Sequence, residues 1–424
     1  MLMKANFCER VLGESDFLHG LRVSENVLGT QCKNKFKVLN KAFRLKYNLG
    51  KRESAVMTSK MKVPYTNFAP KNEQIKRELM NAFEQVLDSG RYIQGPEVKE
   101  FEVEFARYSG TKFAAGLANG TCSLKLTLQA LDLPSNSEVI TAPNSFIASA
   151  SSIVLAGLKP TFVDVAEDMN MDIDLLESAI NEKTKVIMPV HLTGRPAKMD
   201  QILSLAKKYN LYVLEDAAQA VGAKYKRQRV GSFGTAGSFS LHPLKNLHAY
   251  GDAGIVTTND EELWSKLSHL KNHGLSDRIT CETFSSNCRL DELQASFLRI
   301  QLRKLDEWNE VRRTLANTYN EGLVDVVSVP LENENEFHVY QTYMVKVRKR
   351  DELQSFLKAQ GIECIVHYPI PIHLQPAAKS LNHKKGSFPV AEKLSREILS
   401  LPLYPGLSQS DQQYVIDKIH EFYR

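Results

Sequence analysis

The sequence lacks any long apolar run. None of its 424 residues lies in a stretch of about 18 or more apolar residues, the length that indicates a membrane-spanning helix. We therefore expect no transmembrane helix and no membrane partner. Internal repeats are also missing, so the pattern is not that of a repeat array.

Cysteine is sparse and scattered. The six cysteines contain no Cys-x-x-Cys pair, which gives no sign of a disulfide framework. Cys281 and Cys288 could be half of a metal site, but no matching His or Cys pair stands nearby. We expect free thiols, no metal and a cytoplasmic location.

Excess positive charge is confined to one end of the chain. Residues 1–62 carry 13 Lys and Arg against 5 Asp and Glu, a net charge of +8. Because the whole chain has a net charge of +5, the remaining residues sum to −3. A mildly acidic body argues against a general nucleic-acid surface.

Residues 1–62 form a basic N-terminal extension without strand-like alternation. Four interpretations stay open: a mis-assigned start, a disordered basic tail, a targeting peptide, or an arm that binds an anionic partner. Met57 and Met61 stand just before the region where ordered sequence begins, as the first interpretation requires. Glu9 and Glu14 weaken the targeting interpretation, because transit peptides are poor in acidic residues.

The rest of the chain alternates helical and strand-like patterns, and its length suggests more than one domain. Short apolar strands separated by helices predict an α/β fold with a mostly parallel seven-stranded sheet. The last two strands are too close for a helical crossover, so we expect at least one to be antiparallel. We predict a large cofactor-binding domain over 63–300 and a smaller C-terminal α+β domain over 301–424. The expected strands are 113–118, 138–142, 160–165, 185–190, 212–215, 236–241 and 254–258; the expected helices include 75–89, 121–131, 145–156, 173–180, 199–209 and a long stretch over 290–319.

Lys245 and Asp216 are the first candidates for chemistry. Asp216 ends the apolar run 211–216, which reads as a buried strand, and Lys245 follows 29 positions later in a segment with several small residues. A pyridoxal phosphate enzyme needs a lysine amine to hold the cofactor aldehyde and a carboxylate to keep the pyridine nitrogen protonated. The pair alone is weak, because a chain with 54 Lys and Arg often has a lysine near a buried strand.

A phosphate-binding turn is the next candidate. Gly120, Thr121 and Cys122 open a predicted helix directly after a predicted strand. Small residues at a helix N-terminus offer free N–H groups to an anion, although an ordinary capping turn looks the same. Ser240, five residues before Lys245, could add a hydroxyl group to the same phosphate.

Two further side chains could contact a planar cofactor. Phe146 follows a predicted strand, where its ring could lie flat on a cofactor ring, although a core phenylalanine would give the same pattern. Gln219 comes three residues after Asp216 and could donate to a ring hydroxyl group. Ligands bind at the carboxyl ends of strands in such sheets, which is where both residues are expected.

The order of these motifs resembles the DegT/DnrJ/EryC1/StrS family of sugar aminotransferases. The resemblance runs from about residue 63 to the C-terminus and leaves residues 1–62 uncovered. It rests on many ordered motifs. Among them are Asn-Gly-Thr (119–121), Pro-Val-His-Leu-Thr-Gly-Arg (189–195), Glu-Asp-Ala-Ala-Gln (215–219), Gly-Asp-Ala-Gly (251–254), Asn-Cys-Arg-Leu-Asp-Glu-Leu (287–293) and His-Tyr-Pro (367–369).

The resemblance implies a fold-type I enzyme that uses pyridoxal 5'-phosphate to move an amino group. The donor would be an amino acid, glutamate in this family, and the acceptor a nucleotide-linked keto sugar. It implies that Lys245 and Asp216 are catalytic. It also implies that Asn287 reaches the phosphate of a neighbouring subunit in a homodimer with shared active sites. Cys122 and Cys288 depart from the family's common alanine and aromatic residue.

Two alternatives to an aminotransferase remain within the same fold. Dehydratases of the family carry histidine where this chain has Lys245, so lysine here favours amino transfer. A non-catalytic regulatory protein of the same fold is the other alternative, and the presence of Lys245 and Asp216 argues against it. His367, Tyr368 and Arg91 are candidate substrate-pocket residues, with structural roles equally open.

Overall fold

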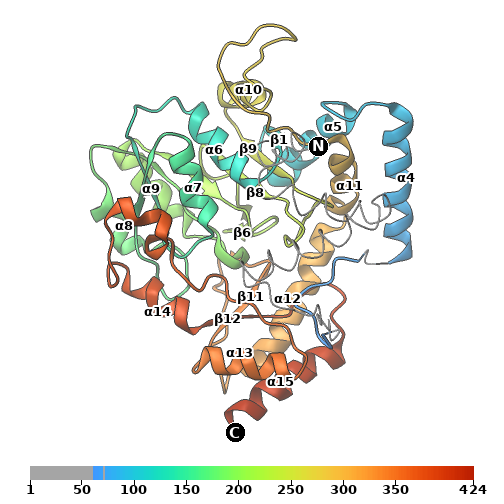
Figure 1. The fold of residues 1–424 in the computed structure, drawn as a ribbon, viewed down its shortest axis with the longest axis vertical. Helices are drawn as coiled ribbons and strands as arrows, with labels where there is room; N and C mark the ends of the chain where they lie inside the picture. The colour runs from blue at the N-terminus through green and yellow to red at the C-terminus, as the bar shows by residue number, and fades with distance from the viewer. Residues whose placement is uncertain (1–60, 70–71) are drawn as a thin grey trace, which may run out of the picture. The chain divides into compact units, whose positions relative to one another are not determined.

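A seven-stranded sheet organises the computed structural model, which describes residues 61–69 and 72–424 (Figure 1). The strand order is β1-β9-β8-β5-β4-β2-β3, and only β9 runs antiparallel to its neighbours. The predicted mostly parallel sheet is confirmed, as is the antiparallel strand near residue 254. The strands are β1 (Phe113–Leu117), β2 (Glu138–Thr141), β3 (Lys159–Phe162), β4 (Thr184–Ile187), β5 (Tyr212–Asp216), β8 (Ala236–Ser240) and β9 (Gly254–Thr258).

Helices bury both faces of this sheet, which explains why apolar residues on both sides of its strands are buried. Successive residues of a strand point to opposite faces, so Ile255 and Val256 of β9 enter two different cores. Phe101 and Leu298 share the core of Ile255, while Leu124 shares that of Val256. The covering helices are α5 (Pro96–Ser109), α6 (Gly120–Ala130), α7 (Ile147–Leu155), α8 (Ile173–Ala179), α9 (Met199–Tyr209), α10 (Glu261–Leu270) and α11 (Glu292–Leu302).

The long helix expected over 290–319 is two helices. α11 ends at Leu302 and α12 (Leu305–Leu323) begins after a turn, in which the Lys304 amide donates to Gln301 O (3.0 Å). Leu302 and Leu305 both belong to the core shared with α5. The turn therefore lets both leucines bury their side chains against one core.

The C-terminal part has its own small sheet and core. β11 (Tyr343–Lys346) and β12 (Ile398–Leu401) pair antiparallel. Their core takes side chains from α12 and from α13 (Arg350–Ala359) and α15 (Gln409–Tyr423), and it also includes Val63. The domain boundary near residue 300 stays a prediction. The other elements include the helices α4 (Glu73–Ser89) and α14 (Pro389–Glu397). A small three-stranded sheet pairs β6 (Lys224–Tyr225) with β7 (Gln228–Arg229) and with β10 (Glu336–Phe337).

A buried carboxylate ties the large sheet to the C-terminal part. Asp164 follows β3 and accepts hydrogen bonds from the amides of Val390 and Ala391, both at 2.9 Å. These amides open α14, where helix geometry leaves N–H groups without intrahelical partners. Asp164 is thus a cap supplied from 226 positions away in sequence.

Within the described part of the chain, no helix is long and apolar enough to cross a membrane. The interpretations of the N-terminal extension concern residues 1–60 almost entirely, and these lie outside the described residues.

Candidate functional site

The candidate residues converge at one edge of the sheet. β5 and β8 are parallel neighbours, and β1 points the same way because both it and β8 pair antiparallel with β9. The carboxyl ends of these three strands therefore meet at a common edge, the usual ligand-binding edge of such sheets. Asp216 ends β5, Ser240 ends β8, and Gly120 opens the helix that follows β1.

Lys245 follows β8 in a tight turn. Its amide donates to His242 O at 2.8 Å, and its side chain is partly buried. The next residue fixes the backbone, since Asn246 Nδ2 donates to Val221 O (2.7 Å) and to Asn309 Oδ1 (2.9 Å). The lysine thus projects from a segment that is anchored on both sides.

Asp216 is only 4% exposed and is held by a chain of hydroxyl groups. Ser149 Oγ donates to Asp216 Oδ2 at 2.7 Å, and Ser145 Oγ lies 2.8 Å from Ser149 Oγ. The Ala218 amide donates to the other carboxylate oxygen at 3.2 Å. Both oxygens of this buried carboxylate are therefore hydrogen-bonded, as buried charge requires.

Burial dominates the electrostatics of the pair. It lowers the pKa of Lys245 from 10.5 to about 8, because desolvation disfavours the ammonium form, and the charge of Asp216 opposes the shift. Burial also raises the pKa of Asp216, against the effect of the Ser149 hydrogen bond. The pKa of His367 falls to about 4 through burial and the charge of Lys245, so this imidazole is neutral at neutral pH.

The first turn of α6 forms a cradle for an anion. Asn119 caps the helix, with its Oδ1 accepting from the Cys122 amide (2.9 Å) and its carbonyl accepting from the Ser123 amide (3.0 Å). Among the described residues, no acceptor takes the amides of Gly120 and Thr121, which helix geometry leaves without intrahelical partners. Two free N–H groups at a helix N-terminus favour a phosphate.

Ser240 closes the cradle from β8. A Cβ atom added at Gly120 would lie 2.8 Å from Ser240 Cβ, so glycine is needed for the two backbones to approach this closely. The thiol of Cys122 turns elsewhere, to Cys288 Sγ at 3.0 Å. The predicted phosphate ligands Gly120, Thr121 and Ser240 thus come together, with Cys122 flanking them.

Aromatic residues stand beside this edge. Phe146 is 53% exposed and its ring lies 5.4 Å from that of Tyr368, tilted by 41°. Gln219 bridges two loops, because its Nε2 donates to Tyr368 Oη (3.3 Å) and its Oε1 accepts from the Thr193 amide (2.6 Å). Phe146 and Gln219 therefore meet at Tyr368, which the sequence offered as a pocket residue. Arg91 is exposed after α4.

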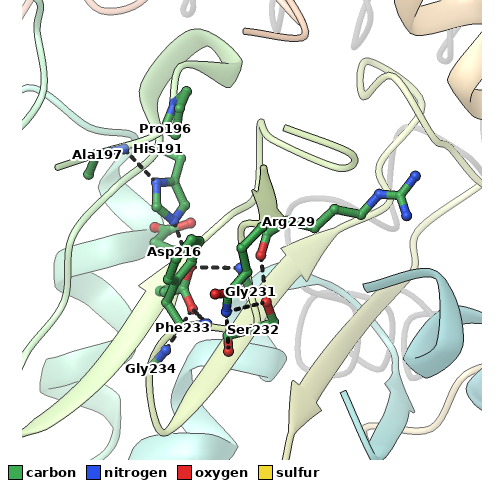
Figure 2. Close-up of polar contacts among 12 residues, drawn as sticks. His191, Pro196, Ala197, Asp216, Arg229, Gly231, Ser232, Phe233 and Gly234 are labelled. Atoms are coloured by element: carbon green, nitrogen blue, oxygen red, sulfur yellow. Dashed lines mark hydrogen bonds and ion pairs between the residues drawn. The ribbon is translucent and has the colours of Figure 1, made fainter. Parts of the chain in front are cut away.

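A second buried carboxylate, Glu215, precedes Asp216 in β5. Figure 2 shows its hydrogen-bond partners His191 and the turn residues Gly231, Phe233 and Gly234. Glu215 accepts from three amides of the turn 231–234 at 2.7, 2.8 and 2.9 Å. His191 Nδ1 accepts from the Ala197 amide (2.9 Å), so its Nε2 carries the proton and donates to Glu215 (3.1 Å). These bonds fix β5 against the turn that enters β8, and hence Asp216 against the strand that carries Ser240.

Asn287 is exposed, although its neighbour in sequence, Cys288, contacts Cys122 beside the cradle. Asn287 stands at the end of a loop over 271–287, which projects beyond α10 (Figure 1). Its backbone bridges to Asn272, and the next residue, Cys288, is buried. The structure thus leaves Asn287 exposed at the surface of its own chain.

Sequence reasoning missed the hydroxyl chain to Asp216. Ser145 and Ser149 are four residues apart in a predicted helix, a spacing that puts them on one face. That spacing was the available signal. The sequence did not show how α7 is rotated about its own axis. That rotation determines that the face with these serines packs toward β5.

The assembled residues suit a phosphorylated pyridine aldehyde. The cradle offers two amides and a hydroxyl group to the phosphate, and the hydrogen-bonded carboxylate of Asp216 can face a ring N–H. An amine whose pKa is near 8 can add to an aldehyde near neutral pH. The site therefore fits the predicted cofactor.

Comparison with known proteins gives consistent matches. The sequence profile of the DegT/DnrJ/EryC1/StrS aminotransferase family matches residues 73–420. A pleiotropic regulatory protein from Geobacillus stearothermophilus is 45% identical, covering 86% of this chain and 99% of that protein. The dTDP-3-amino-3,4,6-trideoxy-alpha-D-glucose transaminase of Streptomyces venezuelae is 40% identical, covering 85% and 96%. The crystal structure of S. venezuelae DesV in complex with a ketimine intermediate matches with a TM-score of 0.83 at 40% identity, covering 85% of this chain and 98% of that one.

The hydroxyl group of Ser149 gives a first prediction. A Ser149→Ala change removes a hydrogen bond to a buried carboxylate, so the pKa of Asp216 rises further and its hold on a protonated ring weakens. Hydrogen bonds to charged groups contribute about 1.5–3 kcal/mol, so we expect at least a roughly tenfold weaker affinity for pyridoxal phosphate, measured by spectroscopic titration of the apo protein.

Ser152→Ala is the matched control. Ser152 is also buried in α7, but its hydroxyl group donates to the Ser149 carbonyl and not to Asp216. Equal affinities for the Ser149→Ala and Ser152→Ala proteins would show that the hydroxyl chain does not support Asp216.

Proposed function

The chain belongs to the DegT/DnrJ/EryC1/StrS aminotransferase family, and we propose that Lys245, Asp216 and the cradle of Gly120, Thr121 and Ser240 hold its pyridoxal phosphate. The protein is a pyridoxal-phosphate-dependent aminotransferase that acts on nucleotide-linked keto sugars. The single observation that supports the residue assignment is the meeting of all five residues at one edge of the sheet.

Lys245 is the proposed proton carrier. With a pKa of about 8, about a tenth of the amine is neutral at pH 7, roughly 300-fold more than at the ordinary value of 10.5. The neutral amine can attach to the cofactor and, once released, can take a proton from the substrate carbon and return it. Burial thus supplies the basicity that a surface lysine lacks at this pH.

The other residues of the site bind and orient the cofactor. When bound, the cofactor supplies an aldehyde that takes up the amino group and a ring that accepts the electron pair left by the departing proton. Asp216, whose carboxylate form is favoured by the Ser149 hydrogen bond, pairs with the ring N–H. The cradle binds the phosphate, and Phe146 and Tyr368 flank the ring. The side-chain amide of Gln219 can donate a hydrogen bond to the ring hydroxyl group.

We further propose glutamate as the amino donor and a cytoplasmic location. The family resemblance supports the donor, and the four described cysteines, all free, support the location.

A direct assay tests this function. Holoenzyme incubated with glutamate and a panel of dTDP-, UDP- and GDP-linked keto sugars should aminate at least one, with the product identified by mass and NMR. Lys245→Ala should lower turnover by at least about a thousandfold, since an essential nucleophile and base is lost. Lys112→Ala, an exposed lysine outside the site, is the control and should turn over normally.

The name of the Geobacillus relative favours one second candidate, a regulatory protein that binds the cofactor without turnover. The same assay separates the two functions. A protein that binds pyridoxal phosphate but aminates no sugar in the panel, with Lys245→Ala unchanged from the native chain, would support regulation over catalysis.

We propose that two copies share their active sites. The loop over 271–287 exposes Ile279 (91%) and Phe284 (99%), apolar side chains that are costly to leave in water. Asn287, at the end of this loop, is exposed, as a residue must be if it reaches the phosphate bound by a second copy. Both observations support a homodimer.

Complementation between two inactive variants tests this sharing. Lys245→Ala and Asn287→Ala chains should each have low activity alone. Mixed after dissociation, they should recover about a quarter of native activity, because half of the random dimers are heterodimers with one complete site. No recovery in dimers shown to be mixed would contradict shared sites, as would full activity of Asn287→Ala alone.

A further inference from the structure

Two cysteines that depart from the family pattern meet beside the cradle. Cys122 lies in the first turn of α6, and Cys288 lies 166 positions later, yet their Sγ atoms are 3.0 Å apart. Both are free thiols. The backbone of Cys288 is fixed, since its carbonyl accepts from the Ala118 amide (3.0 Å) and its amide donates to Lys271 O (2.9 Å).

The surroundings favour a reactive thiolate at Cys288. Ser286 Oγ lies 3.3 Å from its Sγ, and Lys125 Nζ donates to that hydroxyl group at 3.1 Å. The contact with Cys122 Sγ lowers the pKa of Cys288 to about 6, with Ser286, Lys125 and His273 acting in the same direction and burial opposing. The same contact, together with burial, raises the pKa of Cys122.

We propose that a peroxide oxidises Cys122 and Cys288 to a reversible intrachain disulfide. We further propose that this disulfide weakens the binding of the cofactor phosphate by the cradle. The Cys288 thiolate attacks a peroxide oxygen, the O–O bond breaks, and hydroxide leaves with a proton as water. The Cys122 thiol then attacks the resulting sulfenic acid, the S–S bond forms, and a second water leaves. Two thiols thereby give two electrons to one peroxide.

The coupling to the cofactor follows from the tight fit of the cradle, and this half of the proposal rests on the proposed cradle. A disulfide bond is about 2.05 Å long, so the sulfur atoms must approach by about 1 Å. Both backbones are hydrogen-bonded, Cys288 to Ala118 and Lys271 and Cys122 to the N-cap Asn119, so the movement strains the first turn of α6 as well as the segment at Cys288. Gly120 in that turn already packs against Ser240, so its amide cannot shift without changing the anion site.

The chain offers matched controls in its other described cysteines. Cys281 is exposed, and its thiol donates to the carbonyls of His273 and Thr283. Cys364 packs against the C-terminal core, where burial raises its pKa. Neither has a second thiol in contact among the residues that the structure describes.

Oxidation of the full-length holoenzyme tests the proposal. After hydrogen peroxide treatment and non-reducing digestion, mass spectrometry should find the Cys122 and Cys288 peptides joined, with the loss of two hydrogen atoms, and dithiothreitol should reverse this. The dissociation constant for pyridoxal phosphate should rise by about tenfold in the oxidised form. Cys281→Ser should behave like the native chain, while Cys122→Ala and Cys288→Ser should show neither the link nor the oxidant-dependent change.

Two results would overturn the proposal: no linked peptide from the folded native chain, or a quantitative link with unchanged cofactor affinity. Ser240→Ala reports on the cradle separately and should bind the cofactor more weakly in the reduced form. If Ser240→Ala binds pyridoxal phosphate as tightly as the native chain, the cradle assignment is wrong, and so is the proposed effect of the disulfide on cofactor binding. The mass of the linked peptide would still show whether the disulfide forms.

Discussion

A carboxylate buried at the end of β5 is the constraint on which the site depends. Asp216 has lost nearly all contact with water, and an ion in that position is costly unless its oxygens are hydrogen-bonded. Ser149 and the Ala218 amide meet this requirement, and the charge of Lys245 opposes the rise in the pKa of Asp216. The same burial lowers the pKa of Lys245, so one local environment shifts the pKa values of both groups.

The fold supplies that environment through the direction of its strands. β1, β5 and β8 end at one edge, which brings together residues from distant parts of the chain. Glu215 holds this edge in register by binding the turn that leads into β8, with His191 completing its hydrogen bonds. Of these two adjacent acids in β5, Glu215 holds the structure, and Asp216 has the proposed role of binding the cofactor.

The sequence predicted the parts whose signals are local. Apolar runs identified the strands, and the order of turn, aromatic residue, carboxylate and lysine led to the prediction of Gly120, Phe146, Asp216 and Lys245 as site residues. Contacts set by tertiary packing were not predictable from such patterns. Ser149 meets Asp216 only because of how α7 lies on the sheet, and the break before Leu305 reflects competition for one core.

The two unusual cysteines show the same limit. In the sequence, Cys122 and Cys288 were two separate expected departures from the family pattern, 166 positions apart. Only the pairing of Cys288 with Ala118 places its thiol against the first turn of α6. The contact between the two thiols is a more specific observation than the presence of either cysteine alone.

The pH dependence of cofactor attachment to the apo protein tests the central claim, that burial beside Asp216 prepares Lys245. Attachment needs the neutral amine, so its rate constant should rise with pH and level off above a midpoint near 8. Asp216→Asn removes the charge that supports the ammonium form, so the midpoint should move lower still. A midpoint near the ordinary lysine value of 10.5, unmoved by that change, would contradict the account.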